Sequence, residues 1–462
     1  MAKCERKARN EVPVPPSLAA LLSEFRSCFS AWTFPVFCAL ACGLLAQSAR
    51  RTVCGMLVGA QLSKTWSHHR AHRFFSHSRW SVEAVSAILA ALVVRLLVAG
   101  DAAVAVAIDD TLFHRRGPLV HAASWFHDGS AQGQKKIGYG NNWVIAAIVV
   151  RMPFLDRPIA LPVGFALVVK NSGDSSRLAL ARRLVEALAT ALPGRRIEVV
   201  ADSAYAGRLL RGLPQNVTWT TRLRSNAALY DLAPLCTAKR GRPRLKGAKL
   251  ALLAKLAGNA KFTPTTVTAY GTTTTVSVAV IRCLWYGVFG PQAVQVVLVR
   301  DKSTTGYDVA LVTTDLAASA AQIIERYASR WSIVMWLARC LMGLDVSSLG
   351  RPLTVEVSHG DSRFERSART GRAAASNSGN VGTRGAGSAV VDGGWDRWTG
   401  SVGESGSGRQ DGDVVGDALE AGEQSPVVLF QLADAQGEQL DLVGVGRHRG
   451  AQLANLSAVV AA

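Results

Sequence analysis

Two short, mainly apolar runs that each lead into aspartate constrain the fold of this chain most. Residues 103–108 are Ala-Val-Ala-Val-Ala-Ile and precede Asp109 and Asp110, and residues 197–201 are Ile-Glu-Val-Val-Ala and precede Asp202. Apolar runs of this length are typical of strands buried on both faces of a sheet. We therefore expect two central strands, each with a carboxylate at its C-terminal end.

Further strands and an amphipathic helix separate these two runs. Strands are predicted at 143–150 and 161–169, and a helix over 176–192 has its leucines on one side. The order strand, strand, strand, helix, strand indicates an α/β sheet with parallel pairing at its centre. Residues 216–313 are rich in threonine and valine, which favours β structure, and residues 319–333 are predicted to be helical.

The first 100 residues are predicted to form a helical domain. Between its apolar segments, residues 66–80 form a basic, aromatic and histidine-rich turn. Arg70 and Arg73 in this turn are candidates for contacts with DNA phosphates, and the alternative is a solvated loop between helices. A metal site is also conceivable from four histidines, although no cysteine or carboxylate lies among them: His68, His69, His72 and His77.

The charge of the chain points to a polyanionic partner. Its 462 residues include 52 Lys and Arg against 33 Asp and Glu, a net charge of +19. Nucleic acid or an anionic membrane surface would attract such a chain.

A membrane span is not expected, because residues 34–46 are too few and Arg95 interrupts residues 85–99, whereas a span needs about 20 apolar residues. Eight scattered cysteines indicate reduced thiols in a cytoplasmic protein.

The strand-end aspartates suggest metal chemistry. Neighbouring strands can bring the side chains of Asp109 or Asp110 and Asp202 together at one edge of a sheet, where ligands bind in open α/β folds. Carboxylate oxygens are the ligands that Mg²⁺ prefers. A pair of such ions would activate a water or a 3′-hydroxyl and stabilise the leaving oxygen of a phosphodiester. The alternative is that these aspartates only cap helices and turns.

Several longer motifs resemble the bacterial insertion-sequence transposases of the DDE superfamily, in collinear order over residues 25–333. The matching runs are Ile108-Asp-Asp-Thr-Leu-Phe, His127-Asp-Gly-Ser, Gly138-Tyr-Gly-Asn-Asn-Trp-Val, Val200-Ala-Asp-Ser-Ala-Tyr-Ala-Gly, Thr218-Trp-Thr-Thr-Arg-Leu-Arg and Tyr327-Ala-Ser-Arg-Trp-Ser-Ile.

The resemblance implies a ribonuclease H-like catalytic domain over residues 101–333, with a β-rich insertion at about 213–305. It implies Mg²⁺- or Mn²⁺-dependent cleavage and transfer of double-stranded DNA, at transposon ends and target DNA, by a nucleoid-associated homodimer. The first family aspartate corresponds to Asp109 or Asp110, of which Asp109 is favoured, and the second corresponds to Asp202. Arg330 falls in the last motif and is a further candidate for DNA binding.

The third family acid is missing. The last family motif ends in glutamate, where this chain has Val334. Glu325 points to the opposite side of a helix, and Asp345 would lie about 16 Å along it, so neither can replace that acid.

The composition also changes after residue 333. Residues 334–462 hold 11 arginines, no lysine, 15 acidic residues and 21 of the 42 glycines, whereas residues 1–333 carry a net charge of +23. A shifted reading frame or a truncated and fused gene explains both changes, and the alternative is an authentic, largely disordered tail. The expected function is therefore a transposase that is catalytically impaired. The alternative is a non-catalytic DNA-binding repressor, or a remnant of a transposable element.

A basic cluster lies in the predicted insertion. The segment Lys239-Arg-Gly-Arg-Pro-Arg-Leu-Lys contains Lys239, Arg240, Arg242 and Arg244. Its centre resembles an AT-hook, which inserts arginines into the narrow minor groove of A·T tracts. A generic phosphate-binding loop and a solvated hairpin are the alternatives.

Overall fold

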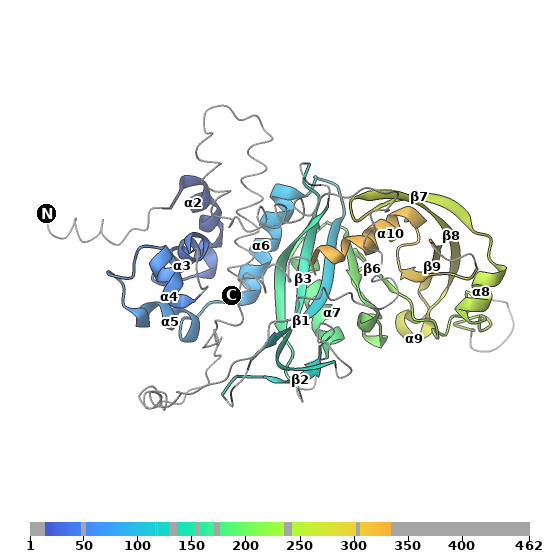
Figure 1. Ribbon diagram of the computed structural model, residues 1–462, viewed down its shortest axis with the longest axis horizontal. Coiled ribbons are helices and arrows are strands. Elements are labelled where there is room, and N and C mark those ends of the chain that lie inside the picture. The colour runs from blue at the N-terminus through green and yellow to red at the C-terminus, as the bar shows by residue number, and fades with distance from the viewer. Residues whose placement is uncertain are drawn as a thin grey trace, which may run out of the picture.

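The computed structural model describes residues 14–47, 52–115, 117, 119–128, 136–153, 155, 157–170, 176–234, 243–301 and 305–333. Within these residues, a group of helices lies at one end of the molecule, a large sheet lies in the middle and a β-rich segment lies at the other end (Figure 1).

Short helices make up the N-terminal end. They are α2 (Pro16–Ser23), the 3₁₀ helix η1 (Glu24–Cys28), α3 (Thr33–Ala46), α4 (Val53–Gly59), α5 (His68–Ser76) and α6 (Val82–Leu97). Hydroxyl side chains cap three of them, because Thr52, Ser67 and Ser81 accept hydrogen bonds from backbone N–H groups in the first turns of α4, α5 and α6. None of the described helices is long and apolar enough to cross a membrane.

The predicted turn over residues 66–80 is wrong, because its centre is the helix α5. Ser67 provides the cap, and Ala71 and Phe74, one turn apart, are buried against the other N-terminal helices. The basic and histidine side chains lie on the exposed side of this helix.

The sheet has ten strands in the described residues. They are β1 (Val104–His114), β2 (Ser124–His127), β3 (Ile137–Val150), β4 (Ile159–Leu167), β5 (Ile197–Ala201), β6 (Val217–Arg222), β7 (Thr263–Ala269), β8 (Thr272–Leu284), β9 (Ala293–Arg300) and β10 (Val309–Thr313). Their order is β2-β3-β1-β5-β6-β10-β9-β8-β7, and β4 also pairs with β3. The central pairs β1–β5 and β5–β6 are parallel, and the others are antiparallel. The predicted mixed α/β fold with N-terminal helices is confirmed.

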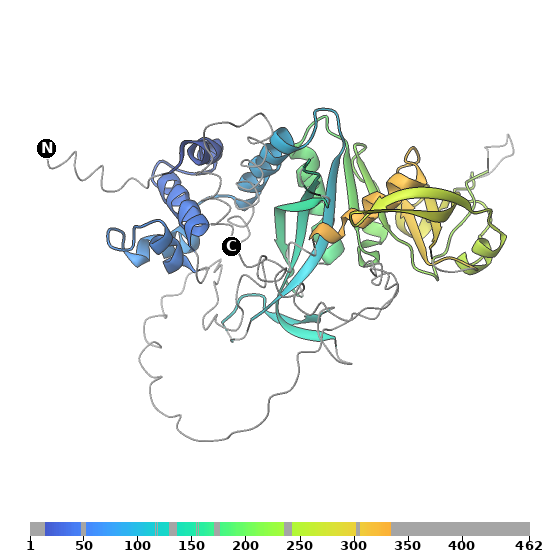
Figure 2. The same cartoon turned by 45° about the horizontal axis from the view of Figure 1, so that its top comes forward.

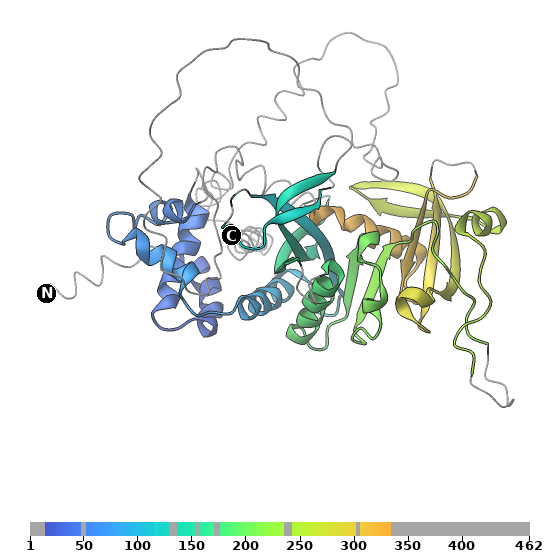
Figure 3. The same ribbon diagram turned by 90° about the horizontal axis from the view of Figure 1, so that it is seen from below.

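Helices cover both faces of the central strands. The helices α6 and α7 (Arg177–Ala191) lie on one face, and α10 (Ala320–Ser329) lies on the other (Figure 3). Val106 and Ile108 of β1 pack in the core with α6 and α7, whereas Ala107 packs on the opposite face with Ile333, the last described residue. Because side chains alternate along a strand, the even-numbered and odd-numbered residues of β1 point to opposite faces of the sheet.

The strands after β6 extend the sheet into the β-rich segment, which also carries the short helices α8 (Leu253–Asn259) and α9 (Tyr286–Phe289). Tyr270 and Gly271 form the two-residue turn between β7 and β8, both with positive φ, as such hairpin turns require. The helix α10 starts at a capping box of Ser319 and Gln322 and runs from the β-rich segment across the central strands (Figure 2).

Candidate active site

Two carboxylates lie next to each other where β1 and β5 part. The last residues of the parallel pairing are Ile108 of β1 and Ala201 of β5, so the next residues along the two chains are Asp109 and Asp202. Adjacent strands are about 4.8 Å apart. Because side chains alternate along each strand, Asp109 and Asp202 both point to the face of the sheet that α10 covers. The sequence prediction that neighbouring strands bring two carboxylates together agrees with this register.

The expected strand ending at Asp109 is wrong, however. β1 continues to His114 through antiparallel pairing with β3, where His114 lies opposite Gly140. Only the parallel pairing with β5 stops at Ile108. Asp109 therefore sits on a strand that is still held on one side, which is a more rigid position than a loop.

The surroundings of Asp109 make its charge unfavourable. Burial raises the pKa of Asp109 to about 6, the charge of Arg330 opposes that rise, and the charges of Asp110 and Asp202 add to it. Arg330 Nη1 donates to Asp109 Oδ2 at 3.0 Å, and the backbone N–H of Asp110 donates to Oδ1 at 2.9 Å. Asp109 thus lies near two other acidic groups, with the Arg330 guanidinium as its cationic partner.

Asp202 caps a short helix, which is one of the two roles that the sequence left as alternatives. Its Oδ1 accepts a hydrogen bond from the backbone N–H of Ser203, so it caps the 3₁₀ helix η2 (Ser203–Tyr205). Its backbone oxygen accepts from Thr221 Oγ1 at 2.9 Å. Within the described residues Oδ2 takes part in no hydrogen bond, which leaves this oxygen available to a ligand.

Asp110 points to the opposite face of the sheet. Its Oδ2 accepts from Asn142 Nδ2 at 2.9 Å and pairs with Arg177 Nε at 3.2 Å, and its Oδ1 accepts from the hydroxyl of Tyr205 at 2.9 Å. Burial and the charges of Asp110 and Asp109 raise the pKa of Tyr205 strongly, so the phenol stays protonated and remains a donor. Asp110 already has three partners, which distinguishes it from Asp109.

Arg330 reaches the carboxylates from the end of α10. The residue is 8% exposed, and its guanidinium carbon lies 5.6 Å from the Tyr327 ring centre and 5.2 Å from that of Trp331. Burial alone would lower the pKa of Arg330, but the negative charges of Asp109 and Asp202 raise it. Arg330 is therefore a permanent cation beside Asp109.

A cleft of about 410 Å³ lies at the end of the sheet near the β3–β4 turn, and its lining includes neither Asp109, Asp202 nor Arg330. Its walls are the β3–β4 turn, the β7–β8 turn and the last turns of α10, and Arg151, Arg157 and Trp331 contribute to them. Glu325 also lines the cleft, where its Oε1 accepts from the backbone N–H of Thr268 on β7 at 2.8 Å. The structure thus ties Glu325 to the β-rich segment, away from the carboxylate pair.

The predicted DNA contacts of the N-terminal helices lie on α5. The guanidinium of Arg70 stacks on the ring of Trp66, 3.7 Å from its centre, and Arg73 is exposed in the last turn. Stacking fixes the direction of the Arg70 side chain, and both arginines are exposed.

Part of the predicted site lies outside the described residues. Of the basic cluster, Arg244 is described and exposed, whereas Lys239, Arg240 and Arg242 fall outside. Val334, Asp345 and the whole segment 334–462 fall outside as well.

Sequence reasoning missed the partners of Asp110. Tyr205 lies three residues after Asp202 and could have been noticed as a tyrosine next to a strand-end acid. Asn142 falls in one of the matching motifs and Arg177 in none, but their proximity to Asp110 depends on pairing of β3 with β1 and on the placement of α7.

Comparison with known proteins supplements this geometry. A family model described as DDE superfamily endonuclease matches residues 24–290. No curated protein matches the chain significantly. The cryo-EM structure of the piggyBac transposase synaptic complex with hairpin DNA is similar at 14% sequence identity and a TM-score of 0.32, over 73% of this chain. This chain spans only 64% of the length of that transposase chain.

Proposed function

This chain belongs to the DDE superfamily endonucleases, and on that premise we propose that it is a transposase-type protein built to bind double-stranded DNA and to cleave and transfer its strands. The observation that supports the proposal most directly is the register of β1 and β5, which sets Asp109 beside Asp202. Paired carboxylates at neighbouring strands are the arrangement that metal-dependent phosphodiester chemistry needs.

Asp109 and Asp202 would hold Mg²⁺ or Mn²⁺. Their oxygens are hard donors, and burial, together with the charges of Asp110 and Asp202, raises the pKa of Asp109, an unfavourable charge state that a divalent cation would relieve. When bound, such ions activate a water or a 3′-hydroxyl and stabilise the leaving oxygen. Arg330 balances and orients Asp109, while Asp110 and its three partners fix the β1 backbone that carries Asp109.

Exposed basic side chains outside the carboxylate pair would contribute to DNA binding. Arg151 and Arg157 line the cleft near the β3–β4 turn and are exposed, so they can contact phosphates there. Arg73 and the cluster of Lys239, Arg240, Arg242 and Arg244 would add contacts farther along the DNA, and Arg330 would act at the cleavage site. A homodimer would then engage the two ends of an element.

We further propose that the chain is catalytically impaired. Val334 stands where the resemblance expects glutamate, and the valine side chain has no oxygen to offer a metal ion. The change of composition after residue 333 supports a shifted frame or a fused gene as the cause. The same residue favours the second candidate function, a DNA-binding repressor or remnant of a transposable element that keeps its DNA affinity without chemistry.

One experiment tests these proposals together. The full chain is incubated with DNA from its own locus, including any inverted repeats, and binding is measured by mobility shift at several salt concentrations. Nicking is then measured with Mg²⁺ or Mn²⁺, with Asp202→Ala as the control. We expect salt-dependent binding without nicking. Nicking that Asp202→Ala abolishes would overturn the impairment, and absence of binding at low salt would overturn both candidate functions.

The origin of the tail has a separate test at the level of the gene. Translation of the other frames beyond codon 333 should reveal a helix that contains the missing glutamate. If neither frame encodes such a helix, the frameshift explanation is wrong.

A further inference from the structure

The N-terminal helices bring together a cysteine and two histidines. Cys54 of α4 and His68 and His72 of α5 each offer a ligand atom, and these atoms all lie within 4.8 Å of one another. The two histidines are one helical turn apart, and their ring centres are 4.1 Å apart. All three residues are exposed, and Cys54 is a free thiol. The cluster is therefore open to an ion from solvent.

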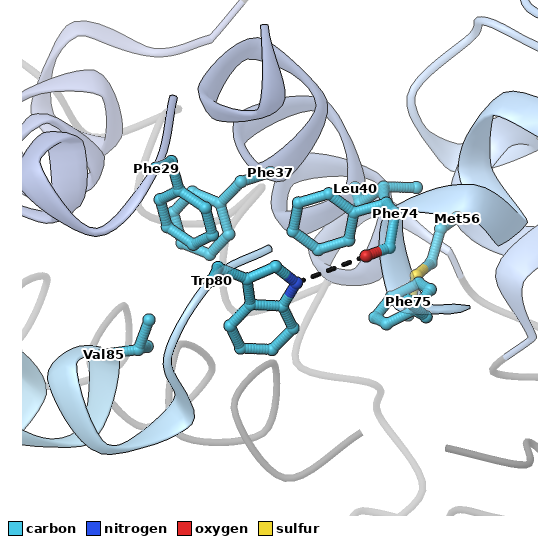
Figure 4. A pocket seen from close by; sticks show the side chains of 8 residues that line it. All are labelled: Phe29, Phe37, Leu40, Met56, Phe74, Phe75, Trp80 and Val85. Carbon is cyan, nitrogen blue, oxygen red and sulfur yellow. Dashed lines mark hydrogen bonds between the residues drawn. The ribbon is translucent and has the colours of Figure 1, made fainter. Parts of the chain in front are cut away.

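Core packing holds the two helices in this arrangement. Met56 of α4 and Phe74 and Phe75 of α5 line the same small apolar cavity (Figure 4). In that cavity the indole N–H of Trp80 donates to the backbone oxygen of Phe74 at 3.2 Å. Each of the two buried residues Met56 and Phe74 lies two positions after a potential ligand, so the packing that aligns the helices also aligns Cys54 with His72.

Hydroxyl caps fix the local backbone of the potential ligands. Thr52 Oγ1 accepts from the backbone N–H of Gly55 at 3.0 Å, directly around Cys54. Ser67 Oγ accepts from the backbone N–H of Arg70 at 3.3 Å, and His68 is the first residue of the helix that this bond starts. The backbone positions of these potential ligands are thus fixed before any ion binds, and binding of an ion requires only rotation of their side chains.

The donor set determines which ion would fit. Two imidazole nitrogens and one thiolate sulfur suit Zn²⁺ and related transition metals, whereas Mg²⁺ prefers oxygen. Zinc bonds of about 2.1 Å to nitrogen and about 2.3 Å to sulfur require the ligand atoms to approach by roughly 1 Å from their present separation.

We propose that Cys54, His68 and His72 form a binding site for Zn²⁺ or a similar transition metal, separate from Asp109 and Asp202. The sequence suggested a possible metal site from four histidines that include His68 and His72, but it did not reveal Cys54 as a ligand, because the two histidines lie 14 and 18 positions beyond the cysteine. Three protein ligands leave a fourth position to water.

A metal ion at this site would link α4 to α5. These helices have 7 and 9 residues, fewer than the roughly 12–15 that an isolated helix needs to persist in water. A bond between them adds stability to the part of the N-terminal end that carries Arg70 and Arg73. The proposal does not depend on the proposed DNA chemistry.

The test uses Co²⁺ and Zn²⁺ with the full chain after removal of bound metal, in excess Mg²⁺ to occupy the carboxylate pair. Co²⁺ bound by a thiolate gives a charge-transfer absorption in the near ultraviolet. We expect one equivalent of Co²⁺ per chain with that absorption, and displacement by Zn²⁺. Cys54→Ser should lose the absorption, and His68→Gln or His72→Gln should weaken binding at least about tenfold.

His69→Gln is the matched control, because His69 is an exposed histidine of the same helix that is not part of the cluster. It should bind Co²⁺ like the wild type. Zn²⁺ should also raise the thermal unfolding midpoint of the wild type and of His69→Gln, but not that of His72→Gln. The proposal is overturned if the wild type shows no thiolate absorption, if the absorption persists in Cys54→Ser, or if His69→Gln and His72→Gln behave alike. Circular dichroism checks that each variant is folded.

Discussion

Removal of the Arg330 guanidinium should destabilise the protein more at pH 7 than at pH 5. Arg330 Nη1 and Asp109 Oδ2 are 3.0 Å apart, and the two side chains are only 10% and 17% exposed. The pKa of Asp109 is about 6, so this carboxyl is mostly protonated at pH 5 and mostly ionised at pH 7. The guanidinium is therefore needed mainly at the higher pH.

The size of this effect follows from the pKa. The ordinary value for aspartate is 3.8, so the raised pKa of Asp109 means that the fold loses stability as the pH rises towards about 6. Without Arg330 the pKa rises further, because burial and the charges of Asp110 and Asp202 remain. At pH 7 Asp109 of the variant then takes up a proton instead of staying charged. Protonation limits the loss of unfolding free energy that depends on the charge of Asp109 to about 1.4 kcal/mol. At pH 5 this charge-dependent loss is close to zero.

Urea unfolding of wild type and Arg330→Leu, followed by tryptophan fluorescence without divalent ions, measures the difference. The variant should lose up to about 1.4 kcal/mol more of its unfolding free energy at pH 7 than at pH 5. In the Asp109→Asn background, Arg330→Leu should have the same effect at both pH values. Equal losses at both pH values in the wild-type background would refute the electrostatic coupling of the two residues.

Three further predictions concern packing, the Asp110 network and the basic cluster. Tyr205→Phe removes the 2.9 Å hydrogen bond to Asp110, so urea unfolding should show a loss of about 1.5–3 kcal/mol, and an unchanged stability would mean that water replaces the hydroxyl. Ile333→Ala empties a fully buried position on the sheet face under α10 and should cost about 2–5 kcal/mol in the same assay; a loss below that range would indicate that the last described residues are not firmly packed. Simultaneous replacement of Arg240, Arg242 and Arg244 by alanine should reduce the slope of log K against log salt for DNA binding by about 2–3, whereas an unchanged slope would support a solvated hairpin.

The strands were predictable wherever the signal was local. The run 197–201 coincides with β5, and the predicted helix 176–192 differs from α7 by one residue at each end. Apolar runs and amphipathic periodicity suffice for these segments, because the residues that become buried are consecutive or regularly spaced in the sequence.

The errors arose where the signal was weak or came from a partner strand. The helix α5 was predicted as a turn because only a few of its residues are apolar, and the basic and histidine side chains obscure its period. β1 was predicted to end at Asp109, whereas β3 keeps it in the sheet as far as His114. A strand with polar residues persists when its backbone hydrogen bonds are satisfied by a neighbour, and the neighbour is not visible in the run itself.

By itself, the sequence determined that Asp109 and Asp110 directly follow the apolar run of the first central strand. It also identified Asp202 as the acid at the end of the second central strand. Only the tertiary structure decided which side carries the carboxylate pair, because that depends on Arg330, 221 positions after Asp109, and on α7 with Arg177 on the other face. The grouping of Cys54 with His68 and His72 was decided in the same way. Contacts between distant segments depend on how the helices pack onto the sheet and onto one another, and no local pattern of residues encodes that packing.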